Sequence, residues 1–224
     1  MFDQKSISLQ AEVDKNIRKL KSKKIYLIRH GQTDFNFQNI VQGGGVDSDL
    51  NETGRAQAQA FYKVYKSIPF DKVYTSALKR SIQSVEGFIK DGHKHEIHPE
   101  LNEIHWGIKE KIKITEDEND YYVNIVNCWK NGQTELCIEG GESPNAVAER
   151  LRKFLDLILT REDEETILIC MHGRAMRIFL CVMLNYELKC MDQFAHKNLG
   201  LYVINHTGSM FNIETYNSLE HLEE

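Results

Sequence analysis

Short apolar runs alternate with amphipathic segments along most of the chain. Two of these runs, at 24–28 and 166–171, are uninterrupted and rich in β-branched residues, as is typical of buried strands. Shorter or more polar strands are predicted at four further places: 70–75, 96–98, 202–205 and 211–215. Apolar residues at helical spacing predict helices between the strands: 56–65, 77–89, 146–160 and 175–184. Asn51 or Thr53 is expected to cap the first helix, and Ser143 precedes the third.

This alternation favours one fold class. Strands that alternate with helices of about 10 to 15 residues predict an α/β protein, here a three-layer α/β/α sandwich with a mostly parallel central sheet. We expect one domain over 24–217, after an N-terminal extension at 1–23 and before a tail at 218–224. Within the extension, 7–20 is either a short surface helix or disordered. The least regular part of the domain, 107–140, is expected to form mixed helices in a lid or insert.

Composition narrows the class of protein further. A length of 224 residues fits one large domain. A net charge of −5 argues against a nucleic-acid partner, and the chain has no long uncharged apolar run of the kind that crosses a membrane. The five cysteines are odd in number and form no C-x-x-C, and the first 23 residues lack the apolar core of a signal peptide. We therefore expect a cytoplasmic protein with reduced thiols, either a monomer or a homodimer.

The chemistry is concentrated where two buried strands end. His30 and His172, each followed by a glycine, terminate these strands although they stand 142 positions apart. Because ligands bind outside the carboxyl ends of parallel strands, both histidines are expected at one edge of the sheet. Arg29 precedes His30, and Arg80 lies early in the helix after the 70–75 strand. Guanidinium groups match phosphate oxygens in pairs, so this set predicts a phosphate site.

Each member of this set also has a structural interpretation. A single histidine after a strand is more often a hydrogen-bonding residue than a nucleophile, and an arginine on a helix is usually solvated. Gly31 and Gly173 either relieve strain in a turn or offer N–H groups to an anion at the start of a helix. The convergence of all these residues on one edge favours the functional interpretation. Among the nine histidines, only His30 and His172 are assigned chemistry.

Other candidate sites are weaker. His93, His95 and His98 form an H-x-H-x-x-H cluster, but no cysteine lies nearby, so a solvated surface strand is favoured over a metal site. The chain has neither G-x-x-x-x-G-K-[ST] nor G-x-G-x-x-G. We expect no cofactor and no metal.

Five motifs in order resemble the histidine phosphatase superfamily, the phosphoglycerate-mutase-like proteins. They are Arg-His-Gly-Gln-Thr at 29–33 with Asn36, the segment 49–58, the segment 74–80, Leu-Asn-Glu at 101–103 and Gly-Gly-Glu-Ser at 140–143. The second His-Gly, at His172, completes the set, and the resemblance spans about 24–184. The chain departs from the family at 108–111, where tryptophan-glutamate-glycine is usual, and at Ser81, where alanine is common.

The resemblance implies a phosphoglycerate-mutase-like fold and a role for each matched residue. Neutral His30 would attack phosphorus and become a phosphohistidine, while Arg29, Arg80 and a protonated His172 would stabilise charge on the phosphoryl oxygens. Glu103 would act as general acid and then as general base. The substrate contacts implied by the family fall on four positions: Asn36, Gln42, Gly43 and Gly173. No metal is required by this mechanism.

Three functions remain open at this point. The leading one is hydrolysis of a small phosphorylated metabolite, because the interval of 69 positions between Glu103 and His172 resembles the phosphatase branch rather than the longer insert of the mutases. The second is a mutase of the phosphoglycerate type. The third, a non-catalytic module that binds a phosphorylated ligand, would be favoured had His30 or Glu103 been replaced.

Overall fold

A six-stranded sheet forms the centre of the molecule. The computed structural model describes residues 21–113 and 115–223, so the helix considered at 7–20 lies outside the described residues. The sheet has the strand order β3-β2-β4-β1-β5-β6. Its strands are β1 (Lys23–Arg29), β2 (Lys72–Thr75), β3 (His95–Ile97), β4 (Thr166–Met171), β5 (Leu201–His206) and β6 (Phe211–Ser218).

The sheet is mostly parallel, as the sequence predicts. β1 pairs with β4 in parallel, and β4 and β3 pair with β2 in the same way, whereas β5 and β6 join as antiparallel strands on the other side of β1. In the β1–β4 ladder Ile28 lies opposite Cys170, and Arg29 lies opposite Met171. The residues that follow these two strands therefore leave the sheet side by side.

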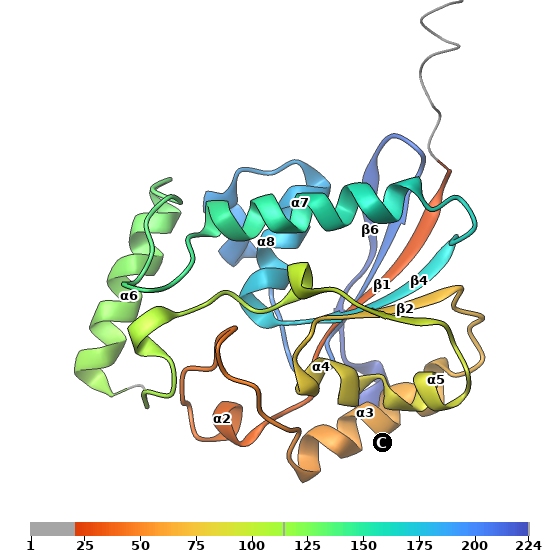
Figure 1. The fold of residues 1–224 in the computed structure, drawn as a ribbon, viewed down its shortest axis with the longest axis horizontal. Helices are drawn as coiled ribbons and strands as arrows, with labels where there is room; N and C mark the ends of the chain where they lie inside the picture. The colour runs from red at the N-terminus through yellow and green to blue at the C-terminus, as the bar shows by residue number, and fades with distance from the viewer. Residues whose placement is uncertain (1–20, 114, 224) are drawn as a thin grey trace, which may run out of the picture.

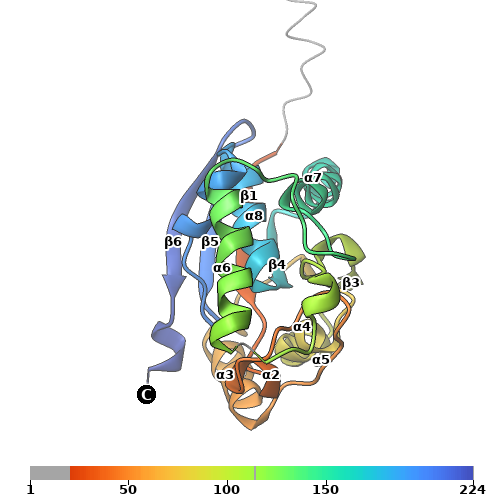
Figure 2. The same ribbon diagram turned by 90° about the vertical axis from the view of Figure 1, so that its left-hand side faces the viewer.

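Helices cover both faces of the sheet and complete the three layers. α7 and α8 lie on one face, and α3, α4 and α5 lie on the other (Figure 1, Figure 2). Alternation along β1 explains the two layers, because Leu27 packs into the core beneath α7 and α8 while Ile28 packs into the core beneath α3 and α5. The helices are α2 (Asp34–Phe37), α3 (Glu52–Tyr65), α4 (Lys79–Ser84), α5 (Glu86–Lys90), α6 (Glu116–Lys130), α7 (Pro144–Thr160) and α8 (Gly173–Leu184).

Capping residues start the two long surface helices as expected. The Asn51 side chain accepts a hydrogen bond from Gly54 N at the start of α3, and the Ser143 side chain accepts one from Ala146 N at the start of α7. Asn51, and not the alternative Thr53, is therefore the cap of α3.

The helix predicted over 77–89 is in fact two short helices. Val85 leaves the helical path, with φ −119° and ψ 13°, and separates α4 from α5. Just before the break, Ser84 at the end of α4 accepts a hydrogen bond from Gly31 N at 2.9 Å. After the break, α5 approaches α3 so closely that a Cβ on Gly87 would lie 2.6 Å from the ring of Tyr62.

Two peripheral segments pack against the two cores, one segment on each face of the sheet. In the irregular 107–140 segment, α6 places the fully buried Trp129 in the same core as α7 and α8, where its ring centroid lies 5.7 Å from that of Trp106. At the other end, the segment expected as a tail forms a short 3₁₀ turn at Glu220–Leu222. This turn packs onto the domain, because the buried ring of His221 meets Phe61 of α3 edge to face at 5.1 Å.

Candidate active site

Both histidines of the His-Gly pairs lie at the carboxyl edge of the sheet. His30 follows β1 and His172 follows β4, and His30 N donates a hydrogen bond to Met171 O at 3.0 Å. The two ring centroids lie 5.1 Å apart, and both side chains are buried. Parallel pairing of two strands thus brings together residues that the sequence separates widely.

Hydrogen bonding fixes the tautomer of His30. Its Nδ1 lies 2.7 Å from Gly31 O, and because a carbonyl oxygen can only accept, Nδ1 carries the proton. Burial, followed by the charges of Arg80 and Arg29, lowers the pKa of His30 well below 6.5. His30 is therefore a neutral imidazole whose Nε2 has a lone pair available for attack.

The structure makes His172 neutral as well, which differs from the protonated form that the resemblance implies. Its Nδ1 accepts a hydrogen bond from Arg80 Nε at 3.2 Å, and its Nε2 lies 2.7 Å from Ser76 Oγ. Burial, then the charges of Arg80 and of other groups nearby, lowers the pKa of His172 well below 6.5. Ser81, where the family commonly has alanine, extends this chain of hydrogen bonds, with its Oγ 2.7 Å from Ser76 Oγ.

Arg80 is a fully buried cation near the start of α4. Besides its bond to His172, it donates to Val46 O at 2.5 Å and to Gly43 O at 3.2 Å. Burial lowers its pKa to about 10, so it stays protonated at neutral pH. Its partners are an imidazole nitrogen and two carbonyl oxygens, all of them neutral acceptors.

Arg29 contacts a residue that the sequence did not single out. Its NH1 lies 3.0 Å from Nδ1 of His196, in the loop before β5. Burial lowers the pKa of Arg29 to about 10, and its buried Nε has no hydrogen-bond partner among the described residues. The sequence assigns no chemistry to His196, because it ends no strand and belongs to no motif. Only the packing of its loop against β1 reveals it.

The side chain of Glu103 lies at the N-terminus of α8, the helix that begins directly after His172. Its Oε1 accepts hydrogen bonds from Ala175 N at 2.8 Å and from Ile104 N at 2.9 Å, and its Oε2 accepts one from Arg174 N at 3.1 Å. The side chain is buried, and the N-terminus of a helix is a favourable place for a carboxylate. The structure therefore brings Glu103 to the edge where both histidines lie.

Two of the four residues expected to contact substrate, Asn36 and Gln42, have polar side chains, and both side chains make hydrogen bonds within the protein. The side chain of Gln42 is engaged within its own loop, accepting from Thr33 Oγ1 at 2.8 Å and donating to Ser48 Oγ. Gln42 therefore braces the loop from within. Asn36 Oδ1 accepts from Thr33 N at the start of α2 and from Asn198 Nδ2, both at 3.3 Å, so Asn36 lies beside the loop that carries His196.

Gly43 is required by a close approach of two loops. A Cβ at this position would lie 2.7 Å from Ile104 O, so a larger residue would push the loop away from the segment after Glu103. Glu110 fastens the same approach, because its Oε1 accepts from Gly45 N at 3.1 Å and from Trp106 N at 3.0 Å. Sequence reasoning missed Glu110, although this glutamate stands within the 108–111 departure from the family pattern.

Gly173 begins α8 immediately beside the ring of His196. A Cβ at this position would lie 3.0 Å from Cε1 of that ring, a tight contact that only a shift of the ring would relieve. The second glycine of the two His-Gly pairs thus makes room for a neighbour of Arg29.

The described residues contain no group of three or more His, Cys, Asp or Glu side chains placed to hold a metal ion. In the histidine cluster after α5, His93 Nδ1 lies 3.0 Å from Phe70 O and His95 Nε2 lies 2.9 Å from Thr75 Oγ1.

Among the described helices, none combines the length and the apolar character needed to cross a bilayer.

A neutral buried histidine between two arginines, at the carboxyl edge of a parallel sheet, defines a site that can bind a phosphoryl group and attack it. Residues 25–219 match the family model of the histidine phosphatase superfamily (branch 1), and the chain belongs to that family. The identification agrees with the resemblance seen in the sequence motifs.

Relatives carry names from both sides of the family. A probable phosphoglycerate mutase GpmB of Erwinia tasmaniensis is 28% identical over 210 residues, which cover 89% of this chain and 95% of the relative. An adenosylcobalamin/α-ribazole phosphatase of Salmonella typhi is 26% identical over 168 residues, covering 72% and 79%. The solved structure of YhfR from Bacillus stearothermophilus superposes with a TM-score of 0.78 at 24% identity, covering 90% of this chain and 100% of that one. Family membership implies an enzyme of phosphorylated small molecules, either a phosphatase or a mutase.

Proposed function

We propose that the protein is a phosphatase that hydrolyses a small phosphomonoester through a phosphohistidine on His30. The observation that carries the proposal is the state of that side chain. Nδ1 of His30 holds its proton against Gly31 O at 2.7 Å, so Nε2 is the nucleophilic nitrogen. Burial, and then the positive charges of Arg80 and Arg29, lower the pKa of His30, and the same two charges can bind an anion.

The first half-reaction forms a phosphorus–nitrogen bond and breaks the phosphorus–oxygen bond of the ester. Nε2 of His30 attacks phosphorus, while Arg29 and Arg80 stabilise the charge on the phosphoryl oxygens. Glu103, in its protonated form, transfers its proton to the leaving alkoxide, which departs as an alcohol. Because the pKa of His30 lies well below 6.5, the nucleophile stays neutral in mildly acidic solution.

The second half-reaction returns the enzyme to its starting state. The carboxylate of Glu103 takes a proton from water, the resulting hydroxide attacks phosphorus, and the phosphorus–nitrogen bond breaks. Inorganic phosphate leaves, Nε2 of His30 regains its lone pair, and Glu103 carries a proton again. Neutral His172 contributes by accepting a hydrogen bond from Arg80 Nε, which orients that guanidinium.

A hollow beside Arg29 has the size of a small-molecule subsite, although His30 is not among the residues that line it. The hollow measures about 400 Å³, and it contains side-chain amides, one further cation and no carboxylate. Small-molecule pockets typically measure about 300 to 1,000 Å³. The lining residues are Arg29, Phe35, Asn36, Asn39, Ile40, His196, Lys197 and Asn198.

Turnover of a generic aryl phosphate in the presence of EDTA tests the hydrolase directly. We expect release of inorganic phosphate without added metal, and His30→Ala should lower kcat by at least about 10⁴-fold because the nucleophile is lost. The matched control is His93→Ala, which alters a histidine bonded to Phe70 O far from the carboxyl edge. Strict dependence on an added divalent metal, or normal activity of the His30 variant, would overturn the mechanism.

A second assay separates hydrolysis from mutase chemistry. Incubation with 2- or 3-phosphoglycerate should yield inorganic phosphate. Interconversion of the two isomers without phosphate release would establish a mutase instead, a result that the mutase name of one relative makes worth seeking.

A further inference from the structure

We propose that His196 is a positioning residue for Arg29: it fixes the direction of the guanidinium while leaving its positive charge for the phosphoryl group. The inference rests on the proposed function, since it assigns a second residue to the binding of the transferred phosphate. His196 belongs to none of the motifs that identify the family, and its role follows from the contacts of its loop.

The hydrogen bond between the two side chains has only one possible direction. A guanidinium has no acceptor atom, so Arg29 NH1 donates and His196 Nδ1 accepts across 3.0 Å. The Arg29 Nε, by contrast, is buried without a partner among the described residues. The imidazole therefore supplies an orienting contact to a guanidinium that the rest of the fold leaves partly unsatisfied.

The neutrality of His196 is the important property. Burial, followed by the charges of Arg29, Arg177 and Arg174, lowers the pKa of His196 to about 2, so the ring accepts hydrogen bonds throughout the working pH range. A nearby carboxylate shows the alternative, because Asp192 Oδ1 binds Arg174 NH1 at 2.6 Å and Arg177 NH1 at 2.7 Å. Those two arginines are paired with an anion inside the protein, whereas Arg29 receives an acceptor of no charge.

The loop that carries His196 is held on both sides of the ring. Ala195 N donates to Tyr216 Oη at 2.9 Å, and Lys197 N donates to Asn217 Oδ1 at 3.2 Å, so β6 anchors both neighbours. The ring itself lies over Gly173 at the start of α8. An acceptor fixed in this way can hold Arg29 in one orientation before the substrate arrives, which is the condition for electrostatic preorganisation.

Three substitutions separate the acceptor from the charge. His196→Asn keeps an acceptor near the place of Nδ1, His196→Leu removes it at similar volume, and His196→Asp keeps an acceptor but adds a negative charge. The measurements are kcat/KM for an aryl phosphate, the dissociation constant of inorganic phosphate by calorimetry, and the melting temperature. The control is His93→Leu, which removes a histidine remote from Arg29.

We expect a graded result. His196→Asn should stay within about threefold of the wild type, and His196→Leu should lose about 10- to 100-fold in kcat/KM, the range of one misoriented contact. His196→Asp should weaken phosphate binding at least as much as His196→Leu, because an internal carboxylate competes with phosphate for Arg29. In an Arg29→Met background, His196→Leu should have less than a twofold further effect, since the residue it positions is gone.

Equal losses in the Asn and Leu variants, losses that follow the melting temperature alone, or full additivity with Arg29→Met would overturn the proposal. A wild-type protein that binds phosphate but cleaves no phosphomonoester would overturn the proposed hydrolase alone. The phosphate dissociation constants would then still decide the role of His196.

Discussion

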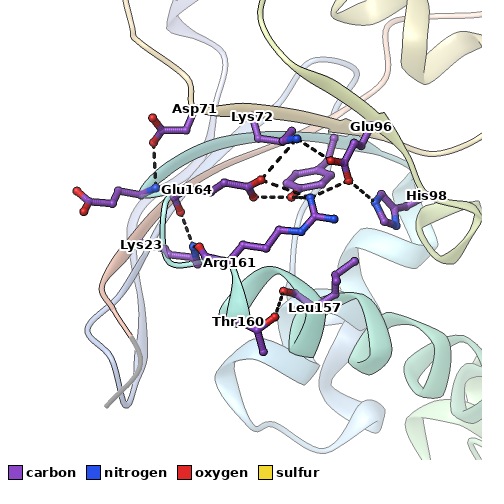
Figure 3. Close-up of polar contacts among 11 residues, drawn as sticks. Lys23, Asp71, Lys72, Glu96, His98, Leu157, Thr160, Arg161 and Glu164 are labelled. Carbon is purple, nitrogen blue, oxygen red and sulfur yellow. Dashed lines mark hydrogen bonds and ion pairs between the residues drawn. The ribbon is translucent and has the colours of Figure 1, made fainter. Parts of the chain in front are cut away.

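The carboxyl ends and the amino ends of the strands in the central sheet, here called its carboxyl edge and its amino edge, differ in the acceptors that their cations contact. Within the described residues, Arg29 and Arg80 at the carboxyl edge donate hydrogen bonds only to neutral acceptors, which are imidazole nitrogens and carbonyl oxygens. With the neutral His30 and His172 they form what is here called the carboxyl-edge site. At the opposite edge, the amino-edge network pairs its cations with carboxylates (Figure 3). Its members are Lys72, Tyr74, Glu96, Arg161 and Glu164.

Distances within the amino-edge network are those of short, charge-assisted hydrogen bonds. Glu96 accepts from Lys72 Nζ at 2.6 Å and from Arg161 NH1 at 2.7 Å. The hydroxyl of Tyr74 accepts from Arg161 at 2.7 Å and donates to the buried Glu164 at 2.5 Å. Lys23 closes the same edge by donating to the carbonyl oxygens of Arg161 and Glu164.

Cations without a paired carboxylate favour ligand binding, whereas cations paired with carboxylates favour stability of the fold. A buried cation that lacks a carboxylate destabilises the folded protein, but its charge is available to a ligand. A cation paired inside the protein stabilises its neighbours and has little left to offer an anion. The fold places the first kind at the carboxyl edge, where the proposed substrate would bind, and the second kind where the strands begin.

Removal of one cation from the carboxyl-edge site gives the largest expected effect. Arg29→Met should lower kcat/KM by about 10² to 10³-fold, the usual loss for one group that stabilises a phosphoryl oxygen. Because burial already lowers the pKa of Arg29 to about 10, the charged form is disfavoured in the folded state, and the melting temperature should stay constant or rise. A clear fall in the melting temperature with activity preserved would break the contrast between the edges.

Disruption of the amino-edge network should do the reverse. Glu164→Leu removes the buried carboxylate that Tyr74 and Arg161 contact, and should destabilise the protein by about 2 to 3 kcal/mol, or roughly 5 to 10 °C in melting temperature. Activity at 25 °C should not change, since the network lies at the other edge. Glu149→Ala, at an exposed pair with Lys153, is the control and should change stability little.

Acid should weaken the amino-edge network in a defined pH window. Burial alone would raise the pKa of Glu96, but hydrogen bonds from Lys72, Arg161 and His98 outweigh it and lower the pKa to about 2, against 4.5 for an ordinary glutamate. The folded pKa lies below the unfolded one, so this stabilisation is complete above about pH 4.5 and is lost as the pH falls toward 2. Urea unfolding at pH 7, 4.5 and 3 measures the decline, which Glu96→Gln should make shallower.

The smallest effect concerns strain near the carboxyl-edge site. Lys111 holds φ at +66°, in the left-handed region that favours glycine, while its N–H donates to Val41 O. The left-handed conformation costs a residue with a side chain about 1 to 2 kcal/mol, a cost that glycine does not have. Glycine in turn loses more chain entropy on folding, which costs about 0.5 to 1 kcal/mol and offsets part of this gain. Lys111→Gly should therefore raise stability by up to about 1 kcal/mol in urea unfolding. A loss of stability would show that the lysine side chain contributes more than its backbone costs.

Much of the fold could be predicted because its signals are local. The apolar runs that become β1 and β4, the cap at Asn51 and the two His-Gly pairs can each be identified within about ten residues of sequence. The break at Val85 could not, because the residues on either side of it make contacts with distant segments: Ser84 with Gly31 N, and Gly87 with Tyr62 of α3. No pattern in the sequence of a helix reports a contact with a loop that lies far away along the chain.

The sequence by itself determined that His30 and His172 meet at the carboxyl edge, because strands that end in Arg-His-Gly and His-Gly bring these residues together once they pair in parallel. Tertiary structure alone decided what each group contacts and which protonation state it holds. Arg29 donates to Nδ1 of His196, and Arg80 Nε donates to Nδ1 of His172, so that this nitrogen of His172 carries no proton. The physical reason is range, since strand formation follows from neighbouring residues, whereas hydrogen-bond direction and burial depend on how separate loops pack together.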